Sequence, residues 1–363
     1  MSRAGRGVRA AAVPAPAGLL ACLAVASLVL AAFGEPRGRS DHSGTGAAGE
    51  PDRPAITTCA TRIPGRPELR LAYITAGLPA GTCPAGHVLH PRDGSAAGRM
   101  RPDWKRWEAE PDPAAPVLLH GRRPVVFVHG TPGSARAFAG YLRRRDLVDR
   151  FLLISIDRPG FGLTRPKRAE PALQRQAAAI TGLLAALPAG TPPAILVGHS
   201  LGGPIIAAAA TRDPDKVGGL VVLAGAFDPA FERVHPLQHL GEAPPFVWLL
   251  SRSLRNANRE LIPLRGELER LRADLLRLRQ PVLVLHGTRD RLVPYGNVAY
   301  LMRLAGGAPR FEVRPLAGFD HFIVWTAPDA VANAIGDMDA WLAGLSRRRS
   351  ADADRAAASS PSP

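Results

Sequence analysis

The chain has 363 residues, enough for one large domain or two ordinary ones. Its 46% hydrophobic and 21% charged residues exclude an intrinsically disordered protein. The net charge of +15 comes almost entirely from arginines scattered along the chain, without an aromatic-interleaved basic motif, so we expect no nucleic-acid partner.

Residues 1–35 have the character of a targeting segment. Three arginines precede an apolar run at 17–33, and positive charge before such a run directs the following chain out of the cytoplasm. The run has about 17 residues, between a signal-peptide core and a bilayer span, so a signal peptide and a retained membrane anchor both stay open. A lipoprotein-like box at 19–22 is the third alternative. We expect an exported protein, in the cell envelope or periplasm or secreted, and membrane-associated if residues 17–33 are retained.

Residues 36–68 are predicted to be a linker and N-terminal segment, because small residues, proline and charge dominate their first half. Cys59 and Cys83 are the only cysteines after the apolar run. In an oxidising compartment they can pair, which would stabilise this part of the chain by about 3 kcal/mol. Two unpaired thiols are the alternative.

The main domain is predicted at 69–345, beginning with an alternating strand at 69–75 and interrupted by a Pro/Gly/Arg-rich insertion at 78–123. Short, continuous apolar runs then alternate with helical stretches. Continuous apolar strands joined by helices predict a parallel sheet that is buried on both faces. The runs lie at 125–128, 152–156, 194–197, 220–223, 282–285 and 311–313.

The strand at 125–128 leads directly into a loop with the sequence HGTPG, from His129 to Gly133. Its flexible backbone can present the Thr131 N–H toward an oxyanion, together with the N–H of Leu201. His129 itself is expected to be a hydrogen-bonded structural residue. The turn at 157–162 is likewise interpreted as structural.

The strongest chemical signal is the sequence GHSLG at 198–202, between the strand at 194–197 and a helix predicted at 204–210. A serine hydroxyl becomes a nucleophile only when it is exposed, oriented and deprotonated by a neighbour. A sharp strand-to-helix turn exposes Ser200, the flanking glycines relieve crowding, and the helix start directs N–H groups at developing negative charge. Ser200 is therefore the candidate nucleophile.

A long connection at 226–262 is predicted to form a small helical lid. Its aromatic residues could line an apolar cover over the nucleophile, which predicts a small or medium, apolar acyl substrate. Alternatively, they only dock the lid on the body of the domain. The candidate residues are Phe227, Phe231, Phe246 and Trp248. A leucine stripe at 264–278 predicts a further helix packed on the sheet.

His321 lies on the loop after the last predicted strand, and this position makes it the candidate general base. His199 and His286, beside strand ends, are expected to be structural. From residue 346 to residue 363 the composition predicts a solvated, disordered tail.

The chain resembles the α/β-hydrolase family over residues 69–77 and 124–345, and most closely its serine-nucleophile branch with an HGxPG oxyanion loop. The resemblance implies an α/β-hydrolase fold, with a mostly parallel sheet flanked by helices and a small helical lid. It further implies a Ser-His-Asp triad of Ser200, His321 and Asp290 that cleaves an ester or related acyl bond through an acyl-enzyme, without metal or organic cofactor.

Proteins with the same oxyanion loop but an aspartate nucleophile act as epoxide hydrolases or dehalogenases, and Ser200 at this position argues against both activities. Cofactor-free perhydrolysis (haloperoxidase activity) and carbon–carbon hydrolysis stay open. From a different class, an inactive, membrane-tethered binding scaffold is the remaining alternative.

Three aspartates compete to orient His321. Asp290 follows the strand at 282–285, whose end lies beside the strand that delivers His321, so its carboxylate can reach the imidazole. Asp228 occupies a position that some relatives use, but the following proline favours an ordinary turn role. Asp320 directly precedes His321, and adjacent loop residues usually point apart. We therefore predict Asp290.

Overall fold

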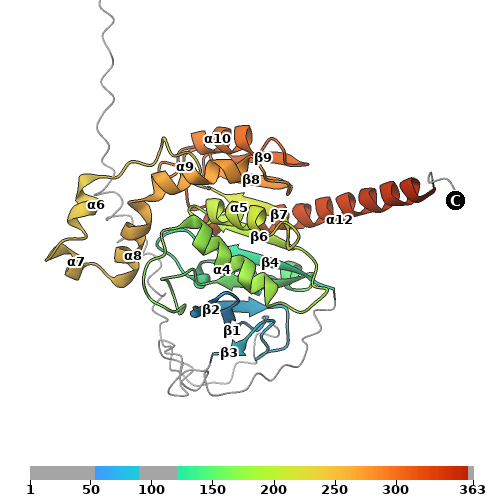
Figure 1. Cartoon of the computed structure of the whole chain (residues 1–363), viewed down its shortest axis with the longest axis horizontal. Coiled ribbons are helices and arrows are strands. Elements are labelled where there is room, and N and C mark those ends of the chain that lie inside the picture. Colours follow the sequence, from blue (N-terminus) through green and yellow to red (C-terminus); the bar gives the residue numbers. More distant parts are fainter. Residues whose placement is uncertain (1–53, 90–120, 359–363) are drawn as a thin grey trace, which may run out of the picture.

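The computed structural model describes residues 54–89 and 121–358. Its centre is a nine-stranded sheet with the order β3-β1-β2-β5-β4-β6-β7-β8-β9 (Figure 1). The strands from β4 to β9 pair in parallel, whereas β1, β2 and β3 pair antiparallel at one edge. The bounds are β1 Thr57–Ile63, β2 Arg66–Ala76, β3 His87–Val88, β4 Arg123–Val128, β5 Phe151–Ile156, β6 Ala194–His199, β7 Val217–Leu223, β8 Val282–Gly287 and β9 Phe311–Leu316. The predicted fold class, a mostly parallel sheet flanked by helices, is confirmed.

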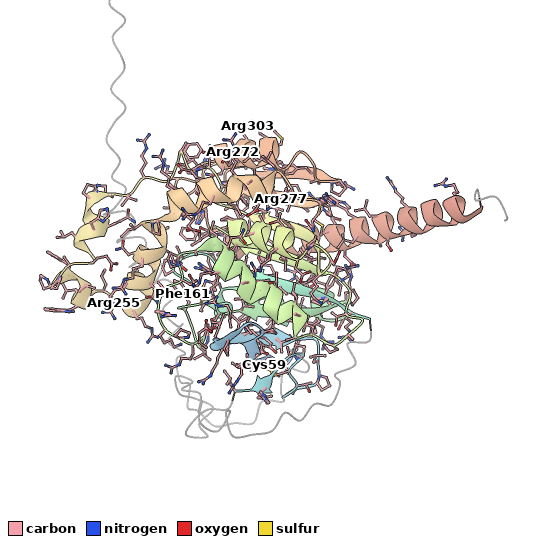
Figure 2. All side chains as sticks on the ribbon, viewed as in Figure 1. Cys59, Phe161, Arg255, Arg272, Arg277 and Arg303 are labelled. Atoms are coloured by element: carbon pink, nitrogen blue, oxygen red, sulfur yellow. A yellow bond between two sulfur atoms is a disulfide. The ribbon has the colours of Figure 1, made fainter. Side chains whose placement is uncertain are left out.

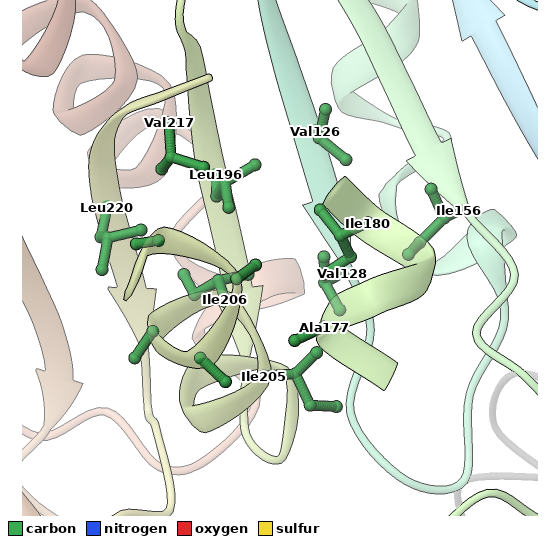
Figure 3. Close-up of a cluster of buried hydrophobic side chains, with 14 of the residues drawn as sticks. Val126, Val128, Ile156, Ala177, Ile180, Leu196, Ile205, Ile206, Val217 and Leu220 are labelled. Carbon is green, nitrogen blue, oxygen red and sulfur yellow. The ribbon is translucent and has the colours of Figure 1, made fainter. Parts of the chain in front are cut away.

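Helices cover both faces of the sheet (Figure 1). Because successive strand residues point to opposite faces, Val126 and Val128 of β4 join one buried cluster, while Val125 and Phe127 join the other. Figure 3 shows the first cluster, where α4 and α5 pack against the central strands. The short and long helices are η1 Ala135–Phe138, η2 Tyr141–Arg143, α3 Arg145–Val148, α4 Leu173–Ala185, α5 Gly202–Arg212, α6 Pro236–Leu240, α7 Phe246–Leu249, α8 Arg252–Leu261, α9 Leu264–Leu275, α10 Gly296–Leu304, α11 Ile323–Thr326 and α12 Pro328–Ala358.

The leucine stripe forms α9, as the sequence predicts. Its buried residues recur every three or four positions and join the same cluster as α4 and α5, which fixes α9 on the sheet. These residues are Leu264, Leu268, Leu271 and Leu275.

The sequence does not predict β1 or β3, which extend the sheet before residue 69 and after residue 78. A disulfide joins Cys59 on β1 to Cys83, in the loop before β3, so the predicted pairing is confirmed. Cys59, on β1, is fully buried (Figure 2). The disulfide therefore attaches the chain after β2 to the antiparallel edge of the sheet.

Helix α12 extends to Ala358, whereas the sequence predicts a disordered tail from residue 346. No glycine or proline interrupts the segment between Ser346 and Ala358, and its alanines and arginines are strong helix formers. Adding turns to a helix that is already packed avoids the cost of nucleation. The tail prediction was wrong for this part of the chain, because packing of the first turns propagates the helix.

The predicted lid segment contains α6, α7 and α8, which project from one end of the sheet (Figure 1). The predicted targeting run at 17–33 and most of the insertion, residues 90–120, lie outside the described residues. Within residues 54–89 and 121–358, no helix combines the length and apolar character needed to cross a bilayer.

Candidate active site

Ser200 occupies a sharp turn, the elbow, between the end of β6 and the start of α5. Its φ of +54° lies in the left-handed region, which costs an L-residue roughly 1–2 kcal/mol. The elbow is held by backbone hydrogen bonds, because the Ser200 N–H donates to the Leu223 carbonyl at 2.9 Å and its own carbonyl accepts from Gly203 N–H at 2.9 Å. The neighbouring strand and the helix start thus enforce the strained conformation.

The elbow packs backbone against backbone on the loop that follows β4. A Cβ atom at Gly202 would lie 2.2 Å from the Val128 carbonyl oxygen, and one at Gly130 would lie 2.9 Å from the Ser200 Cβ. Neither distance is tolerable, so only glycine fits at both positions. This close approach brings the HGTPG loop beside the candidate nucleophile.

Two backbone donors are left open where these segments meet. The N–H groups of Thr131 and Leu201 have no acceptor among the described residues. The Gly130 carbonyl, in the same trans peptide as the Thr131 N–H, accepts from Arg158 Nη2 at 2.9 Å and contacts His129 Nδ1 at 2.7 Å. Because a trans peptide directs its C=O and N–H oppositely, the Thr131 N–H faces away from Arg158.

His321 and Asp290 form a buried pair, with 2.7 Å between Nδ1 and Oδ2. The other carboxylate oxygen accepts from the N–H groups of Leu292 and Val293 at 2.9 and 2.8 Å. Burial raises the pKa of Asp290, but hydrogen bonds from His286 and His321 outweigh it and leave the pKa below its ordinary value. The carboxylate is therefore ionised and aimed at the imidazole.

The two rival aspartates have local roles. Asp228 Oδ1 accepts from the N–H of Ala230 at 2.9 Å, and Asp320 Oδ1 accepts from the N–H of Phe322 at 2.9 Å. Both are turns in which a short carboxylate caps a backbone group two residues ahead. Within the described residues, Asp290 is the one of the three whose carboxylate contacts His321.

His199 links the elbow to the His321 loop. Its Nε2 lies 3.0 Å from the His321 carbonyl oxygen, and the two rings are 4.7 Å apart. Burial lowers the pKa of His199 to about 3, so the ring is neutral and donates from Nε2. No hydrogen bond joins the Ser200 hydroxyl directly to His321 in the part of the chain that the structure describes. His199, which directly precedes Ser200, makes the contact between the elbow and the His321 loop.

The four predicted lid residues do not gather at one place. Phe227 is buried in the core, where its ring packs against Gly203 in the first turn of α5 and against Gly225 after β7. Phe231 is 43% exposed and lies against Gly296. Phe246 and Trp248, on α7, are 43% and 72% exposed.

Two charged residues that the sequence does not single out lie next to the HGTPG loop. Arg158 and Glu260 are each 1% exposed and form an ion pair at 2.9 Å. Arg158 belongs to the turn at 157–162, which is interpreted from the sequence as structural. Glu260 lies 102 residues later on α8, and no spacing rule connects positions that far apart.

Comparison with known proteins identifies related hydrolases. Residues 125–334 match the Alpha/beta hydrolase family. The chain is 31% identical over 224 residues to a pimeloyl-[acyl-carrier protein] methyl ester esterase of Chromobacterium violaceum, covering 52% of this chain and 84% of that protein. It is 28% identical over 245 residues to a 2-(acetamidomethylene)succinate hydrolase of Mesorhizobium japonicum, covering 58% of this chain and 86% of that protein.

Solved structures give the same architecture. A serine hydrolase of Cycloclasticus zankles superposes with a TM-score of 0.52 at 14% identity, covering 77% of this chain and 96% of that one. A bacterial membrane phospholipase A superposes with a TM-score of 0.51 at 20% identity, covering 90% of this chain and 97% of that one. At these identities the likeness shows the fold alone.

Proposed function

The chain belongs to the alpha/beta hydrolase family, and we propose that it is a serine hydrolase that cleaves a carboxylic ester or a related acyl bond. Ser200 is the nucleophile, His321 the general base and Asp290 the acid that orients it. The observation that carries the proposal is the strained Ser200 elbow beside two open backbone N–H groups and a buried His–Asp pair. The similarity to a methyl ester esterase supports the ester class.

The first half of the reaction forms an acyl-enzyme. Ser200 Oγ attacks the acyl carbon while His321 Nε2 takes the hydroxyl proton, and the carbonyl electrons move onto the oxygen. The N–H groups of Thr131 and Leu201 stabilise this oxyanion. When the intermediate collapses, His321 returns the proton to the departing alcohol, and the acyl group stays on Ser200.

The second half returns the enzyme to its starting state. His321 accepts a proton from water as the water attacks the acyl carbon, and the Ser200 oxygen leaves with that proton. Asp290 stays ionised and holds the Nδ1–H of His321 throughout. This hydrogen bond fixes the tautomer in which Nε2 is free to accept a proton.

We propose a small or medium, apolar acyl substrate. Six of the eleven exposed large hydrophobic residues in the described chain lie within the lid segment 226–262. Exposed apolar side chains that recur in one segment are typical of a surface that meets an apolar ligand, which favours aliphatic over charged acyl groups. The six are Phe231, Val234, Leu240, Phe246, Trp248 and Leu249. A panel of nitrophenyl esters tests this, and clear preference for charged or sugar-containing acyl donors would exclude it.

We also propose that the domain works outside the cytoplasm. The Cys59–Cys83 disulfide supports this, because disulfides persist in oxidising compartments and are rare in the reducing cytosol. The basic and then apolar N-terminal segment points the same way.

The decisive experiment is reaction with a fluorophosphonate probe, compared between the wild type, Ser200→Ala and Ser253→Ala. Ser253, on α8, is a serine outside the proposed triad and serves as the matched control. We expect Ser200→Ala to abolish labelling and to lower kcat by about 10⁴-fold or more while the fold is preserved. Retention of more than about a tenth of the wild-type esterase activity would contradict the assignment of Ser200.

A further inference from the structure

We propose that Arg158 and Glu260 form a buried clamp that sets the direction of the Thr131 N–H, so that lid helix α8 aims one donor of the oxyanion hole. The inference rests on the proposed function, because it assigns positioning residues to the same site. Neither residue would touch the substrate. Their contacts, their burial and the geometry of one peptide carry the argument.

The Glu260 carboxylate is fully engaged. Its Oε1 accepts from Arg158 Nη1 and from Gln176 Nε2, both at 2.9 Å. Its Oε2 accepts from Arg158 Nη2 at 3.1 Å and from the Thr131 hydroxyl at 2.7 Å. Buried charges require this degree of pairing, and the two-pronged Arg158 contact fixes orientation as well as distance.

The clamp also holds the peptide that carries the open donor. Arg158 Nη2 donates to the Gly130 carbonyl at 2.9 Å, while the backbone N–H of Arg158 donates to His129 Nε2 at 3.1 Å. Since His129 Nε2 is an acceptor, its proton sits on Nδ1, which donates to the same Gly130 carbonyl at 2.7 Å. Burial lowers the pKa of His129 well below its ordinary value, so the ring stays neutral.

Three contacts therefore fix the Gly130–Thr131 peptide and its side chain from one side. Two donors hold the Gly130 carbonyl and one acceptor holds the Thr131 hydroxyl. A planar trans peptide with a fixed carbonyl has a fixed N–H on the opposite edge. An oxyanion donor gains its effect from being aimed before the reaction, so this fixation has a direct catalytic consequence.

The clamp joins the site to the lid, because Glu260 lies on α8. One turn earlier on the same helix, Asn256 Nδ2 donates to the Gly160 carbonyl at 2.8 Å. The Arg158 guanidinium lies 4.8 Å from the centre of the Phe161 ring, in the loop beside α8 (Figure 2). Buried polar contacts thus dock α8 on the 157–162 loop, and a change in α8 is transmitted to Thr131.

A purely structural role explains the pair less well. A buried ion pair adds little stability over a well-packed apolar pair of the same size. Its hydrogen bonds have fixed directions, however, and here two of them hold the Gly130 carbonyl and the Thr131 hydroxyl, next to one of the two open N–H groups beside Ser200. Removing one partner of a buried pair also costs stability, so kcat measured on folded protein separates the two roles, because only the positioning role changes it.

The test is Thr131→Val, which removes the hydroxyl contact to Glu260 and leaves the backbone N–H in place. Loss of a whole oxyanion donor costs about 10²–10³ in kcat, so a misaimed donor should lower kcat about tenfold, with KM changed less than about twofold. The rate of fluorophosphonate labelling and the affinity for a trifluoromethyl ketone, which mimics the tetrahedral intermediate, should fall by the same factor. Thr131→Ser, which restores the hydroxyl, should restore both.

Glu260→Gln provides a second variant of nearly the same shape, and it should give the same split between kcat and KM. Thr75→Val is the matched control, because the Thr75 hydroxyl also donates a side-chain hydrogen bond, to the Leu153 carbonyl at 2.9 Å, and from a more deeply buried position. It should lower stability at least as much as Thr131→Val does, while kcat stays at the wild-type value.

The outcomes separate the two proposals. If the wild type reacts with the fluorophosphonate and folded Thr131→Val and Glu260→Gln react at the same rate, the clamp is overturned and the serine hydrolase stands. A rise in KM without a fall in kcat would overturn it equally. If the wild type itself does not react, the proposed function fails, and the clamp inference fails with it.

Discussion

The left-handed backbone conformation of Ser200 costs roughly 1–2 kcal/mol, which its surroundings must offset. Its N–H donates to Leu223, and its carbonyl accepts from Gly203 at 2.9 Å and from Ala226 at 3.3 Å. Such strain persists only where neighbouring structure determines it, and it is concentrated at functional sites. The Asp290 carboxylate is likewise held in a costly state by its surroundings. Its side chain is buried yet ionised, because the rings of His321 and His286 and two backbone N–H groups surround it.

We expect the substitution Asp290→Asn to lower kcat by about 10³–10⁴-fold with folding preserved. The asparagine oxygen can still accept from Leu292 and Val293, so the loop keeps its turn. An amide in place of the second oxygen cannot hold the Nδ1–H of His321, and the tautomer needed at Nε2 is lost. Steady-state kinetics on a nitrophenyl ester, with circular dichroism as a check on folding, measures the effect.

Asp228→Asn and Asp320→Asn are the matched controls for this prediction. Both remove one charge from a turn near the site, where the carboxylate caps a local N–H. Each should retain kcat within about threefold, as surface turn substitutions do. A full-rate Asp290→Asn enzyme beside a crippled Asp228→Asn enzyme would move the acid to Asp228.

The sequence predicts these residues to different degrees. Ser200 is marked by its own neighbours, since a strand, two glycines and a helix start are all local signals. Asp290 requires the further step that adjacent parallel strands end side by side. Arg158 and Glu260 carry no such signal, because the contact between them depends on where α8 docks. Long-range side-chain pairing is therefore the part of the site that sequence patterns do not reach.

Among the elements, the predicted strands are those with continuous apolar runs, such as β6, which is buried throughout, and β4, which is buried after its first residue. Strand β1 escapes prediction because threonines and one arginine interrupt its apolar residues. Strand β3 has only two residues, too few for a periodic pattern. Both form through tertiary pairing with β2 and β1, and not through local propensity.

The disulfide at this edge should contribute measurable stability. Replacing Cys59 or Cys83 by alanine opens a loop with a sequence separation of 24 residues. The lost restraint on the unfolded chain corresponds to about 3 kcal/mol, and the change at the buried Cys59 adds to it. Urea unfolding of Cys83→Ala and of the reduced wild type should show the same loss. Equal stability of the oxidised and reduced wild type would contradict this expectation.

For the whole molecule, the pH dependence of the free energy of unfolding is a sum over buried groups, some with lowered and some with raised pKa values. Burial lowers the pKa of His199 to about 3 and that of His129 well below its ordinary value. Burial raises the pKa of Glu232 to about 7 and also raises that of Asp157. As the pH falls, the buried histidines lower the free energy of unfolding, whereas the carboxyls with raised pKa values increase it. The pH dependence of the wild-type stability therefore does not isolate any one group.

A difference between two variants does isolate one group. In the unfolded chain His199 takes up a proton below its ordinary pKa of about 6.5, whereas in the folded protein it stays neutral down to about 3. Protonation therefore favours the unfolded state between these values, and the wild type loses stability as the pH falls through this window. His199→Gln keeps an N–H donor for the His321 carbonyl and removes the titrating ring.

We expect the free energy of unfolding of the wild type, relative to His199→Gln, to fall by about 2 kcal/mol between pH 8 and pH 5. Urea unfolding of both proteins at the two pH values measures this difference, and groups that titrate equally in both cancel. The other titratable groups near His199 are His321, Asp290, His286 and His129, so the two proteins must be compared at one ionic strength. If the difference in unfolding free energy between the two proteins stays constant with pH, the ring takes up its proton as readily in the folded protein as in the unfolded chain. The neutral Nε2–H donor that joins the elbow to the His321 loop would then have to be abandoned.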